Sequence, residues 1–600
     1  MSRNNKKPSK RSAVSHVKYP SGNLKNNVKQ FYSEIILFHK QGNYQKSLDL
    51  SQQALKFFPN DINLLSNAGA LAHTLKQLNL AKEYYQKTLK LKPNDFNAHC
   101  NLATLLKDQK QFEEAIKHYK KALKINPSYA VAHNNLALLF KEQKKFEMAT
   151  KHYQEAIRIN TNYAEAYYNL AILLEEQKRF IEAKEYYQKA LEISPNYADA
   201  HNNFGTLLEE QKEYEKAVKH YKKALENNPN CIDTYNNLAS TFKKQKKFEK
   251  TINYYKKALE INPNCVDTQF HLSLLKLNFG EFNKGFEFYE FRYHENRENR
   301  NAVPPTISTP QYQSDNPNQD LASQHILIIP EQGIGDEVMF ASVLPELSTI
   351  VQQNPSTKIT LACDPRLVEI FNHSFDFLTA IPKDPDNRYA DLEKDLDYWL
   401  FIGSLPKFYR NDIKDFYKHQ PYLTADKMLF SIWKNRFNNL EHDISIGISW
   451  RGGAKAEHKQ ERSLTLKQLT PILTQASQTA NIINLQYGDH AQEIDNFTAQ
   501  IGITIHDWDD ADPFKDLDNF SSQIKALDLV ISIDNSTVHF AGALGTKTFV
   551  MLPFNQDWRW AEERTDSYWY PNIMTLFRQT KDGEWEDVIQ DITNALESAI

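Results

Sequence analysis

The residues between positions 526 and 552 have the types and the order that bind a phosphate group. Residues 529–533 form a β-branched apolar run of the kind found in a buried parallel strand. Residues that favour turns and helix N-caps follow at once, and Gly545 is placed to end the helix that they begin. A helix that starts at the carboxyl end of a parallel strand points free N–H groups into the crevice there. The sequence therefore predicts an anion site, whose candidate residues are Asp534, Asn535, Ser536, Thr537 and His539.

A second strand–loop–helix junction, at residues 326–347, carries a carboxylate. The predicted strand is followed by Gly333 and Gly335, and Asp336 opens the helix. The glycine pair lacks the third glycine of a dinucleotide fingerprint and the lysine of a P-loop, so by itself it is weak evidence for a nucleotide. Asp336 can act as a general base on an acceptor hydroxyl. It is equally well placed to cap the helix, where the dipole would lower its pKa, and both roles remain open.

Further polar residues follow the other predicted strands. Arg451 and Arg462 lie in a polar loop after a strand, and Gln486 ends the next strand. Guanidinium groups can neutralise the phosphates of a nucleotide-sugar without a metal. His539 is interpreted either as a phosphate or ribose contact, which its spacing from Asp534 favours, or as a packed or capping residue. The acidic run 507–512 is interpreted as a loop, so we expect no metal and no cofactor beyond the substrate.

The elements that position these residues alternate between strand and helix from residue 325, which predicts an α/β region with parallel sheets. We expect two Rossmann-like halves, residues 325–425 and 426–600, with the donor bound by the second. A helix near 427–437 is expected to cross between them, and the last helix, 585–599, to pack back across the first half. The predicted strands are 326–329, 358–363, 396–402, 444–450, 481–486, 503–506, 529–533 and 548–552, and the predicted intervening helices include 464–476 and 491–501.

The first half of the chain is an internal repeat of 34 residues. Tyrosines keep this step at 85, 119, 153, 187, 221, 255 and 289, and prolines and small residues keep it in other registers. The period is typical of tetratricopeptide repeats, which have two antiparallel helices per unit. We predict an all-α solenoid of about eight units over residues 28–297, followed by a linker at 298–324. The end units are atypical, as capping requires: Ser51 replaces the tyrosine in the first, and Arg292 replaces a recurrent alanine in the last.

One register of the repeats consists of asparagines that would line the inner face of the solenoid. A carboxamide can donate to and accept from the peptide bond of a bound chain whatever the side chains of that chain are. With its row of asparagines, the array resembles the superhelix of the O-linked N-acetylglucosamine transferases. The predicted partner is a protein or peptide in the groove. The alternative is that these side chains only bond locally. The ladder residues are Asn67, Asn101, Asn135, Asn169, Asn203 and Asn237.

Composition excludes some classes of function. The net charge of −3 gives no basic surface for nucleic acid, and no apolar run is long enough for a membrane span. The four cysteines have no metal-binding or disulfide spacing, which fits a reducing, cytoplasmic compartment. Residues 1–27 have no apolar core and are expected to be a disordered basic tail.

Four segments of the second half together resemble glycosyltransferase family 9, the heptosyltransferase family, in a version fused to tetratricopeptide repeats. They are residues 332–336, 446–451, 534–539 and 557–579. The resemblance implies a GT-B fold, a base at Asp336, diphosphate binding by the backbone of 534–539, and a basic residue such as Arg462 or Arg451. Ser536 departs from the family, which prefers glycine there for close backbone approach.

The resulting prediction is an inverting, metal-independent glycosyltransferase that takes a nucleotide-sugar donor and an acceptor presented by the repeat groove. The alternative is a non-catalytic tetratricopeptide scaffold with a degenerate nucleotide-binding domain.

Overall fold

The computed structural model describes residues 24–294, 297, 303–418, 420–452 and 462–599. The chain forms two compact units, residues 1–241 and 242–600. Most of the predicted tail, 1–27, and much of the polar loop after residue 452 lie outside the described residues. The break between the units falls within a repeat helix, so residues 242–293 of the array pack with the α/β part as one unit.

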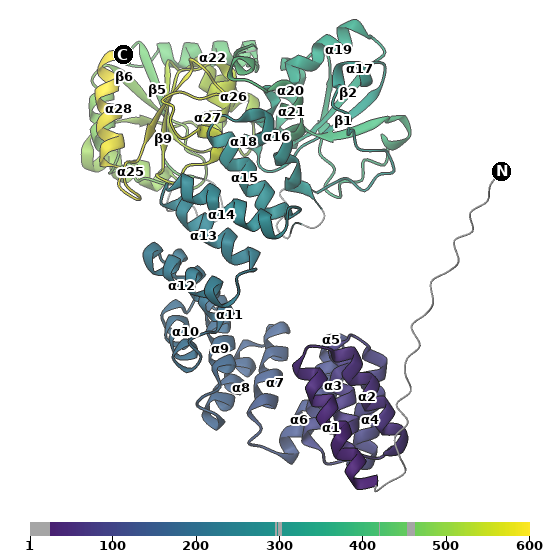
Figure 1. Ribbon diagram of the computed structural model, residues 1–600. Helices are drawn as coiled ribbons and strands as arrows, with labels where there is room; N and C mark the ends of the chain where they lie inside the picture. The colour runs from purple at the N-terminus through teal and green to yellow at the C-terminus, as the bar shows by residue number, and fades with distance from the viewer. Residues whose placement is uncertain (1–23, 295–296, 298–302, 419, 453–461, 600) are drawn as a thin grey trace, which may run out of the picture. The chain divides into compact units, whose positions relative to one another are not determined.

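Helical pairs build the first unit (Figure 1), as the 34-residue period predicts. In two of the pairs the tyrosine ring packs directly over a glycine of the same repeat: a Cβ on Gly69 would lie 2.5 Å from the Tyr85 ring, and one on Gly205 would lie 2.7 Å from the Tyr221 ring. The helices are α1 (Leu24–Lys40), α2 (Tyr44–Phe57), α3 (Ile62–Thr74), α4 (Leu78–Leu91), α5 (Phe96–Asp108), α6 (Phe112–Ile125), α7 (Ala130–Glu142), α8 (Phe146–Ile159), α9 (Ala164–Glu176), α10 (Phe180–Ile193), α11 (Ala198–Glu210), α12 (Tyr214–Asn227) and α13 (Ile232–Lys244).

The turn inside each repeat requires a left-handed residue. Lysines hold this position in six successive repeats, at Lys76, Lys110, Lys144, Lys178, Lys212 and Lys246, with φ between 54° and 60°. Glycines hold the equivalent position at both ends of the array, Gly42 and Gly280. Because left-handed backbone costs a residue with a Cβ about 1–2 kcal/mol, the internal lysines are a local cost that packing offsets.

Histidine pairs join the two helices of three repeats. Their Nδ1 atoms lie 2.9 Å apart in each of the pairs His99–His118, His133–His152 and His201–His220. The first member also donates from Nε2 to a proline carbonyl, at 3.0 to 3.3 Å. In two other repeats both positions are tyrosine, Tyr167 with Tyr186 and Tyr235 with Tyr254.

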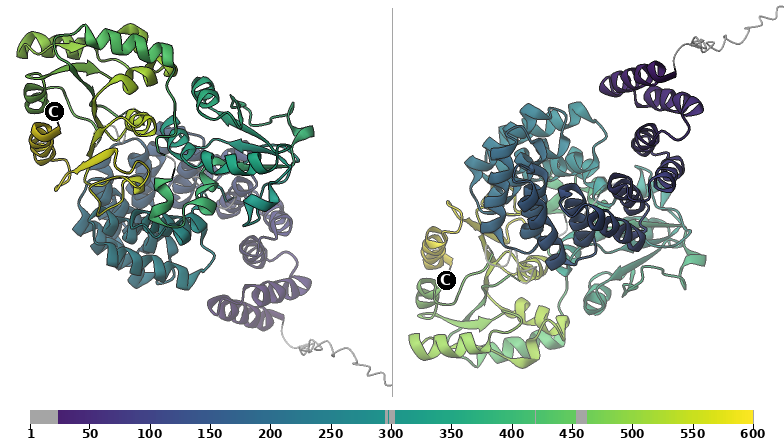
Figure 2. Two further views of the ribbon diagram at one scale, coloured as in Figure 1. Left: turned by 90° about the horizontal axis from the view of Figure 1, so that it is seen from above. Right: turned by 90° about the horizontal axis from the view of Figure 1, so that it is seen from below.

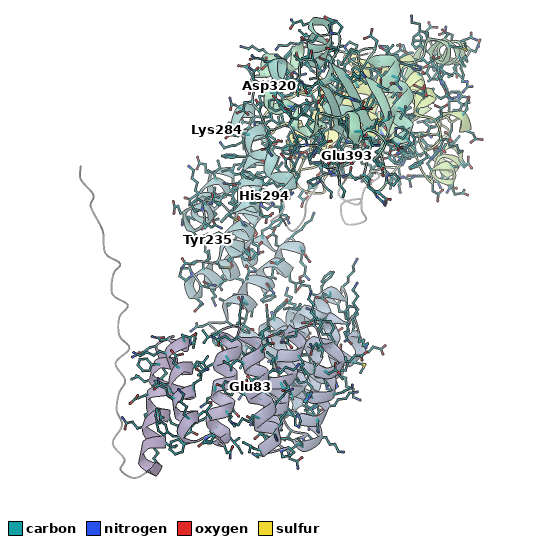
Figure 3. The ribbon with its side chains drawn as sticks, turned by 90° about the vertical axis from the view of Figure 1, so that its right-hand side faces the viewer. Glu83, Tyr235, Lys284, His294, Asp320 and Glu393 are labelled. Atoms are coloured by element: carbon teal, nitrogen blue, oxygen red, sulfur yellow. The ribbon has the colours of Figure 1, made fainter. Side chains whose placement is uncertain are left out.

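In the second unit, the remaining repeat helices precede two parallel sheets. They are α14 (Phe248–Ile261), α15 (Val266–Asn278), α16 (Phe282–Tyr289) and the 3-10 turn η1 (Glu290–Tyr293). Figure 3 labels Lys284 of α16 and His294, which follows η1. The repeats therefore continue to the residues that lead into the predicted linker.

The first sheet has the order β3-β2-β1-β4 and the second β10-β9-β8-β5-β6-β7, all parallel. Figure 2 shows the two sheets as separate teal and yellow-green lobes of the unit. The strands are β1 (His325–Ile329), β2 (Lys358–Cys363), β3 (Thr379–Pro382), β4 (Tyr398–Phe401), β5 (Ile444–Ser449), β6 (Ala480–Asn484), β7 (Ile505–His506), β8 (Leu529–Ile533), β9 (Thr548–Leu552) and β10 (Met574–Arg578).

The helices of this unit cover the sheets. The longer ones are α18 (Ile334–Ala341), α19 (Ser348–Gln353), α20 (Val368–Ser374), α22 (Lys427–Asn438), α24 (Thr470–Ala476), α25 (Ala491–Ile501), α26 (Leu517–Ala526), α27 (Ser536–Leu544) and α28 (Glu586–Ala599). The short turns are α17 (Pro317–Asp320), η2 (Leu344–Leu347), η3 (Pro365–Leu367), η4 (Glu393–Asp395), η5 (Ile402–Ser404), α21 (Pro406–Tyr409), η6 (Ile413–Tyr417), η7 (Asp509–Ala511) and η8 (Trp558–Trp560).

The structure corrects several sequence predictions. The prediction that the last helix packs across the first half was wrong: α28 packs on α24 and β10, because Val588, Ile592 and Leu596 join the core of the second sheet. Strands β3 and β10 and helix α26 were not predicted, and α24 begins six residues later than the sequence suggested.

Candidate functional site

A cavity of about 560 Å³ lies where α18 and α27 begin, at the carboxyl ends of β1 and β8. Figure 1 shows these two helices side by side between the sheets, and they pack on each other. A Cβ on Gly335 would lie 3.0 Å from His539 and 3.5 Å from the Ser536 Cα, so glycine allows the two helix starts to meet. The walls include Gln332, Gly333, Gly335, Asp336, Arg366, Arg462, Asp534, Asn535, Ser536, His539, Asp557 and Arg559.

Asp336 is the third residue of α18, and its carboxylate has two partners. One oxygen accepts a hydrogen bond from the N–H of the N-cap residue, Gly333, at 3.3 Å, and the other pairs with the Arg559 guanidinium. Burial raises the pKa of Asp336, although Arg559 acts in the opposite direction. Gly333 rather than Asp336 is the N-cap of α18, and the Asp336 carboxylate binds the N–H of that residue while it also lines the cavity.

Arg559 is the centre of the charge cluster. Its guanidinium also pairs with Asp557 and donates to the Gln332 side-chain oxygen at 2.8 Å. Burial alone would raise the pKa of Asp557, but Arg559 and Arg462 hold it below its usual range. A guanidinium is always charged and has several N–H donors. It is suited to a diphosphate because two of its N–H groups can donate to two phosphate oxygens at once.

A second arginine faces the first residue of the predicted anion loop. Arg462 Nη1 lies 3.3 Å from Asp534 Oδ2. Burial raises the pKa of Asp534, and Arg462 opposes that rise. Arg366 reaches the same cavity from the first sheet, where Asp364 accepts from its Nε at 2.9 Å. The cavity thus gathers three arginines, each matched by a carboxylate.

The start of α27 is built as predicted. Asn535 is the N-cap: its side-chain oxygen accepts the Thr537 N–H at 3.0 Å, and its amide donates to Ser449 at 2.8 Å. Asn535 and Ser536 line the cavity, whereas the Thr537 side chain is buried beneath it. The cap satisfies one N–H of the first turn, and Ser536, the first residue of the helix, lines the cavity.

His539 is both packed and exposed to the cavity, so the two interpretations are not exclusive. Its ring stacks on Trp560 with centroids 5.4 Å apart, and Nδ1 lies 2.9 Å from the Tyr570 hydroxyl. Burial, with a smaller contribution from Arg559, lowers the pKa of His539 to about 3. The imidazole is therefore neutral and serves as a hydrogen-bonding group rather than a cation.

Two predicted residues lie away from this cavity. Arg451 turns toward α25, where Nη1 is 3.6 Å from Glu493. Gln486 is buried, and its side-chain oxygen accepts the N–H groups of Trp450 at 2.9 Å and Arg451 at 2.7 Å. Both stabilise the carboxyl end of β5, and neither lines the cavity.

Sequence reasoning missed the role of Arg559, Asp557 and Arg366. The first two lie inside the segment 557–560, which was noted only for its resemblance. Arg366 follows a predicted strand by three residues, and a cation at the carboxyl end of a parallel strand is a usable signal. Gln332 was part of a noted segment but received no role.

The asparagine ladder bonds between neighbouring repeats. Asn169 donates to Asn134 at 3.0 Å, Asn203 to the Tyr168 hydroxyl at 2.9 Å, and Asn237 to Asn202 at 3.2 Å. In each case the partner lies 35 residues earlier in the chain. The local-bonding alternative is thus observed for these three side chains. Peptide binding by the ladder remains a prediction.

Neither a metal cluster nor a membrane helix is found in the described part of the chain. No group of three or more His, Cys, Asp or Glu side chains among the described residues is placed to hold a metal ion. In the acidic loop, Asp510 pairs with Arg436 at 2.8 Å and Asp507 with His490 at 3.0 Å. Within the same described ranges, every helix is too short or too polar to cross a membrane.

Comparison with known proteins identifies the repeats. Models described as tetratricopeptide repeat match residues 62–95, 84–117, 130–195, 162–230 and 232–265, and a TPR repeat model matches residues 104–144. Protein FlbA of Caulobacter vibrioides is 28% identical over 338 residues, which are 54% of each chain, so the match spans about half of that relative.

Solved structures resemble the helical part as well. Pseudomonas aeruginosa pilF has 22% identity, with 35% of this chain and 96% of that chain covered and a TM-score of 0.33. A thermophilic TPR protein of Thermus thermophilus, TTC0263, also has 22% identity, with 31% and 99% covered and a TM-score of 0.28. The family models, together with the observed helical pairs, establish that the N-terminal part of this chain is a tetratricopeptide repeat array, followed by a region of parallel sheets.

Proposed function

We propose that the chain is a glycosyltransferase with a GT-B arrangement, which moves a sugar from a nucleotide-sugar to an acceptor that the repeats present. The observation that carries this proposal is the cavity where α18 and α27 begin. Its volume of about 560 Å³ lies within the range of small-molecule sites. Two helix N-termini and three arginines meet there, a combination that suits a diphosphate.

The diphosphate would take the place of the carboxylates now paired with the arginines. Arg559 and Arg462 are held by Asp336, Asp557 and Asp534. A donor diphosphate that draws Arg559 toward itself would release the Asp336 carboxylate toward the cavity. Donor binding and activation of the base would then be one event, so the base would stay paired with Arg559 until the donor is bound.

In the transfer step, the acceptor hydroxyl oxygen attacks the anomeric carbon while the bond from that carbon to the diphosphate oxygen breaks. Asp336 accepts the hydroxyl proton, and the nucleoside diphosphate leaves with the bonding electrons, so the anomeric configuration inverts. Arg559, Arg462 and the N–H groups at the start of α27 stabilise the charge on the departing diphosphate. The neutral His539 offers a hydrogen bond to the phosphate or the sugar.

A tetratricopeptide scaffold is the second candidate, and one observation favours it. Each arginine at the cavity already has a carboxylate partner: Arg462 has Asp534, Arg366 has Asp364, and Arg559 has two. A site that is internally neutralised needs no ligand for its stability. In this alternative the repeats bind a protein partner and the α/β part is inert.

Thermal unfolding with UDP-, GDP- and ADP-sugars separates the two candidates. A ligand at one hundred times its dissociation constant stabilises the folded chain by about 2.7 kcal/mol. The variant Arg559→Lys keeps the positive charge but cannot donate to two phosphate oxygens at once as a guanidinium does. It should therefore lose the donor-induced rise in unfolding temperature. Arg436→Lys is the matched control, because Arg436 pairs with Asp510 through both Nη atoms outside the cavity. If no donor shifts the unmodified protein, the scaffold is the correct function.

A further inference from the structure

Two register positions of the last repeat contact the loop that precedes α18, and at one of them the residue departs from the repeat pattern. The five repeats immediately before it have alanine at the first position, namely Ala122, Ala156, Ala190, Ala224 and Ala258. Arg292 replaces it and donates to both carboxylate oxygens of Glu331, at 2.5 and 2.7 Å, with both side chains fully buried. Glu331 also accepts the Gly403 N–H of the first sheet at 2.8 Å. The repeat is thereby fixed to residues 331–333.

The second position is the recurrent tyrosine, and its hydroxyl leads into the site. Tyr289 accepts a hydrogen bond from the Gln332 amide at 2.8 Å, and the Gln332 oxygen accepts one from Arg559 at 2.8 Å. Arg559 in turn pairs with Asp336. Because a guanidinium can only donate, the Gln332 oxygen must face Arg559, and its NH2 group must face Tyr289. The order of the hydrogen bonds is therefore fixed.

Gln332 also has a left-handed backbone, with φ of 64°, which is unfavourable for a residue with a Cβ. Such a conformation persists when the surrounding contacts enforce it. Here the contacts are the Tyr289 hydroxyl on one side and Arg559 on the other. The loop conformation thus depends on the repeat as well as on the α/β part.

The repeats also hold the second site loop, which carries Arg559. Lys246 Nζ lies 2.7 Å from the Glu562 carboxylate, and the Asn278 carbonyl accepts the Glu562 N–H at 3.1 Å. Gly280 packs so closely that a Cβ there would lie 2.8 Å from the Tyr568 hydroxyl. Both loops that supply the Asp336–Arg559 pair are therefore anchored on residues 246–292.

We propose that Tyr289 and Gln332 are positioning residues of the cavity, through which the last tetratricopeptide repeat holds Arg559 against Asp336. This inference rests on the proposed function for its kinetic consequence, but the anchoring of the loop stands on its own contacts. In other repeats, a hydrogen-bonded hydroxyl of this tyrosine has a partner within the array, such as Thr104 for Tyr119, Glu175 for Tyr187 and Glu209 for Tyr221. In the last repeat the same tyrosine contributes its hydroxyl to the site.

The test uses the full chain with Tyr289→Phe, which removes one oxygen and keeps the buried ring. Tyr153→Phe is the matched control: it has the same register, and its buried hydroxyl has no hydrogen-bond partner in the described structure. Gln332→Gly is the second variant, because glycine keeps the positive φ and removes the side chain. Hydrogen–deuterium exchange is measured for the amides of residues 330–336 without ligand, and kcat and KM with the donor that shifts the thermal transition.

We expect faster exchange at residues 330–336 in both site variants and unchanged exchange there in Tyr153→Phe. We also expect kcat to fall about tenfold with little change in KM for the donor, because the groups are misplaced rather than lost. The pH profile of kcat/KM, which reports groups of the free protein, should shift, since Arg559 is no longer fixed beside Asp336. Unchanged exchange in Tyr289→Phe and Gln332→Gly overturns the inference. If the unmodified protein binds no nucleotide-sugar, the proposed function fails and exchange alone decides the anchoring.

Discussion

Replacing Asp336 by asparagine separates a base from a cap at the site. Asparagine keeps an oxygen for the Gly333 N–H, so this hydrogen bond persists, but it loses the charge that pairs with Arg559. Removing one partner of a buried pair often costs about 3–5 kcal/mol. Here Asp557 and Gln332 still accept from Arg559, and burial already disfavours the charge on Asp336. We therefore expect a loss of unfolding free energy of about 1 kcal/mol or less.

The rate should respond far more strongly than the stability. Loss of a general base lowers turnover by roughly a hundredfold or more. That corresponds to at least about 2.7 kcal/mol of activation free energy. In the unmodified protein, turnover should rise with pH as Asp336 deprotonates, with an inflection above the usual aspartate range because burial raises its pKa. The Asn variant should lose this rise.

Transfer is measured with the donor that gives the largest thermal shift, and stability by urea denaturation of the same preparations. Asp510→Asn is the control, since Asp510 pairs with Arg436 through both oxygens away from the cavity. A variant with unchanged turnover at each pH would refute the role of Asp336 as base. A variant with lost turnover and a loss of several kcal/mol would show that the charge is structural.

Further predictions concern pH, turns and the anion loop. Burial raises the pKa of Glu337 to about 7, so the free energy of unfolding should fall as pH rises through 7 and the buried carboxyl becomes charged. At pH 8, Glu337→Gln should therefore be more stable than the unmodified protein by about 2–3 kcal/mol in urea denaturation. The absence of any gain would contradict this. Burial lowers the pKa of His152 to about 4, so the free energy of unfolding should fall as pH drops from about 6.5 to 4. Converting both His133 and His152 to tyrosine should move the midpoint of acid unfolding to lower pH. An unmoved midpoint would contradict the reasoning. Lys144→Gly should gain up to about 1 kcal/mol by relieving its positive φ, whereas a loss would show that the lysine side chain contributes more. Ser536→Gly should raise donor affinity in calorimetry if backbone approach limits it, and unchanged affinity would exclude that limit.

The repeats and most strands were predictable because their signals are local. A 34-residue period fixes helical pairs, and apolar runs such as 529–533 fix buried strands. The strand β3 was missed because its four residues end in proline, and β10 because Thr575 and Arg578 interrupt its short apolar run. The packing of α28 depended on which sheet had an uncovered face, which no local pattern encodes.

The sequence indicated where the candidate site lies, but not how its arginines and carboxylates pair. Asp534 and Asp336 were found because each follows a strand, and parallel strands bring their carboxyl ends together. Arg559 pairs with Asp336 across 223 residues of sequence, and Arg292 with Glu331 across 39, so only the tertiary fold reveals either pair. Arg292 nevertheless left a signal: a charged residue where the repeat has alanine. In a solenoid, each register position carries a residue type that packs against the next repeat. A residue of another type at that position indicates that it packs against something other than a repeat. Arg292 and Tyr289 mark the place where the α/β part replaces the next repeat, and their partners, Glu331 and Gln332, lead directly to the cavity.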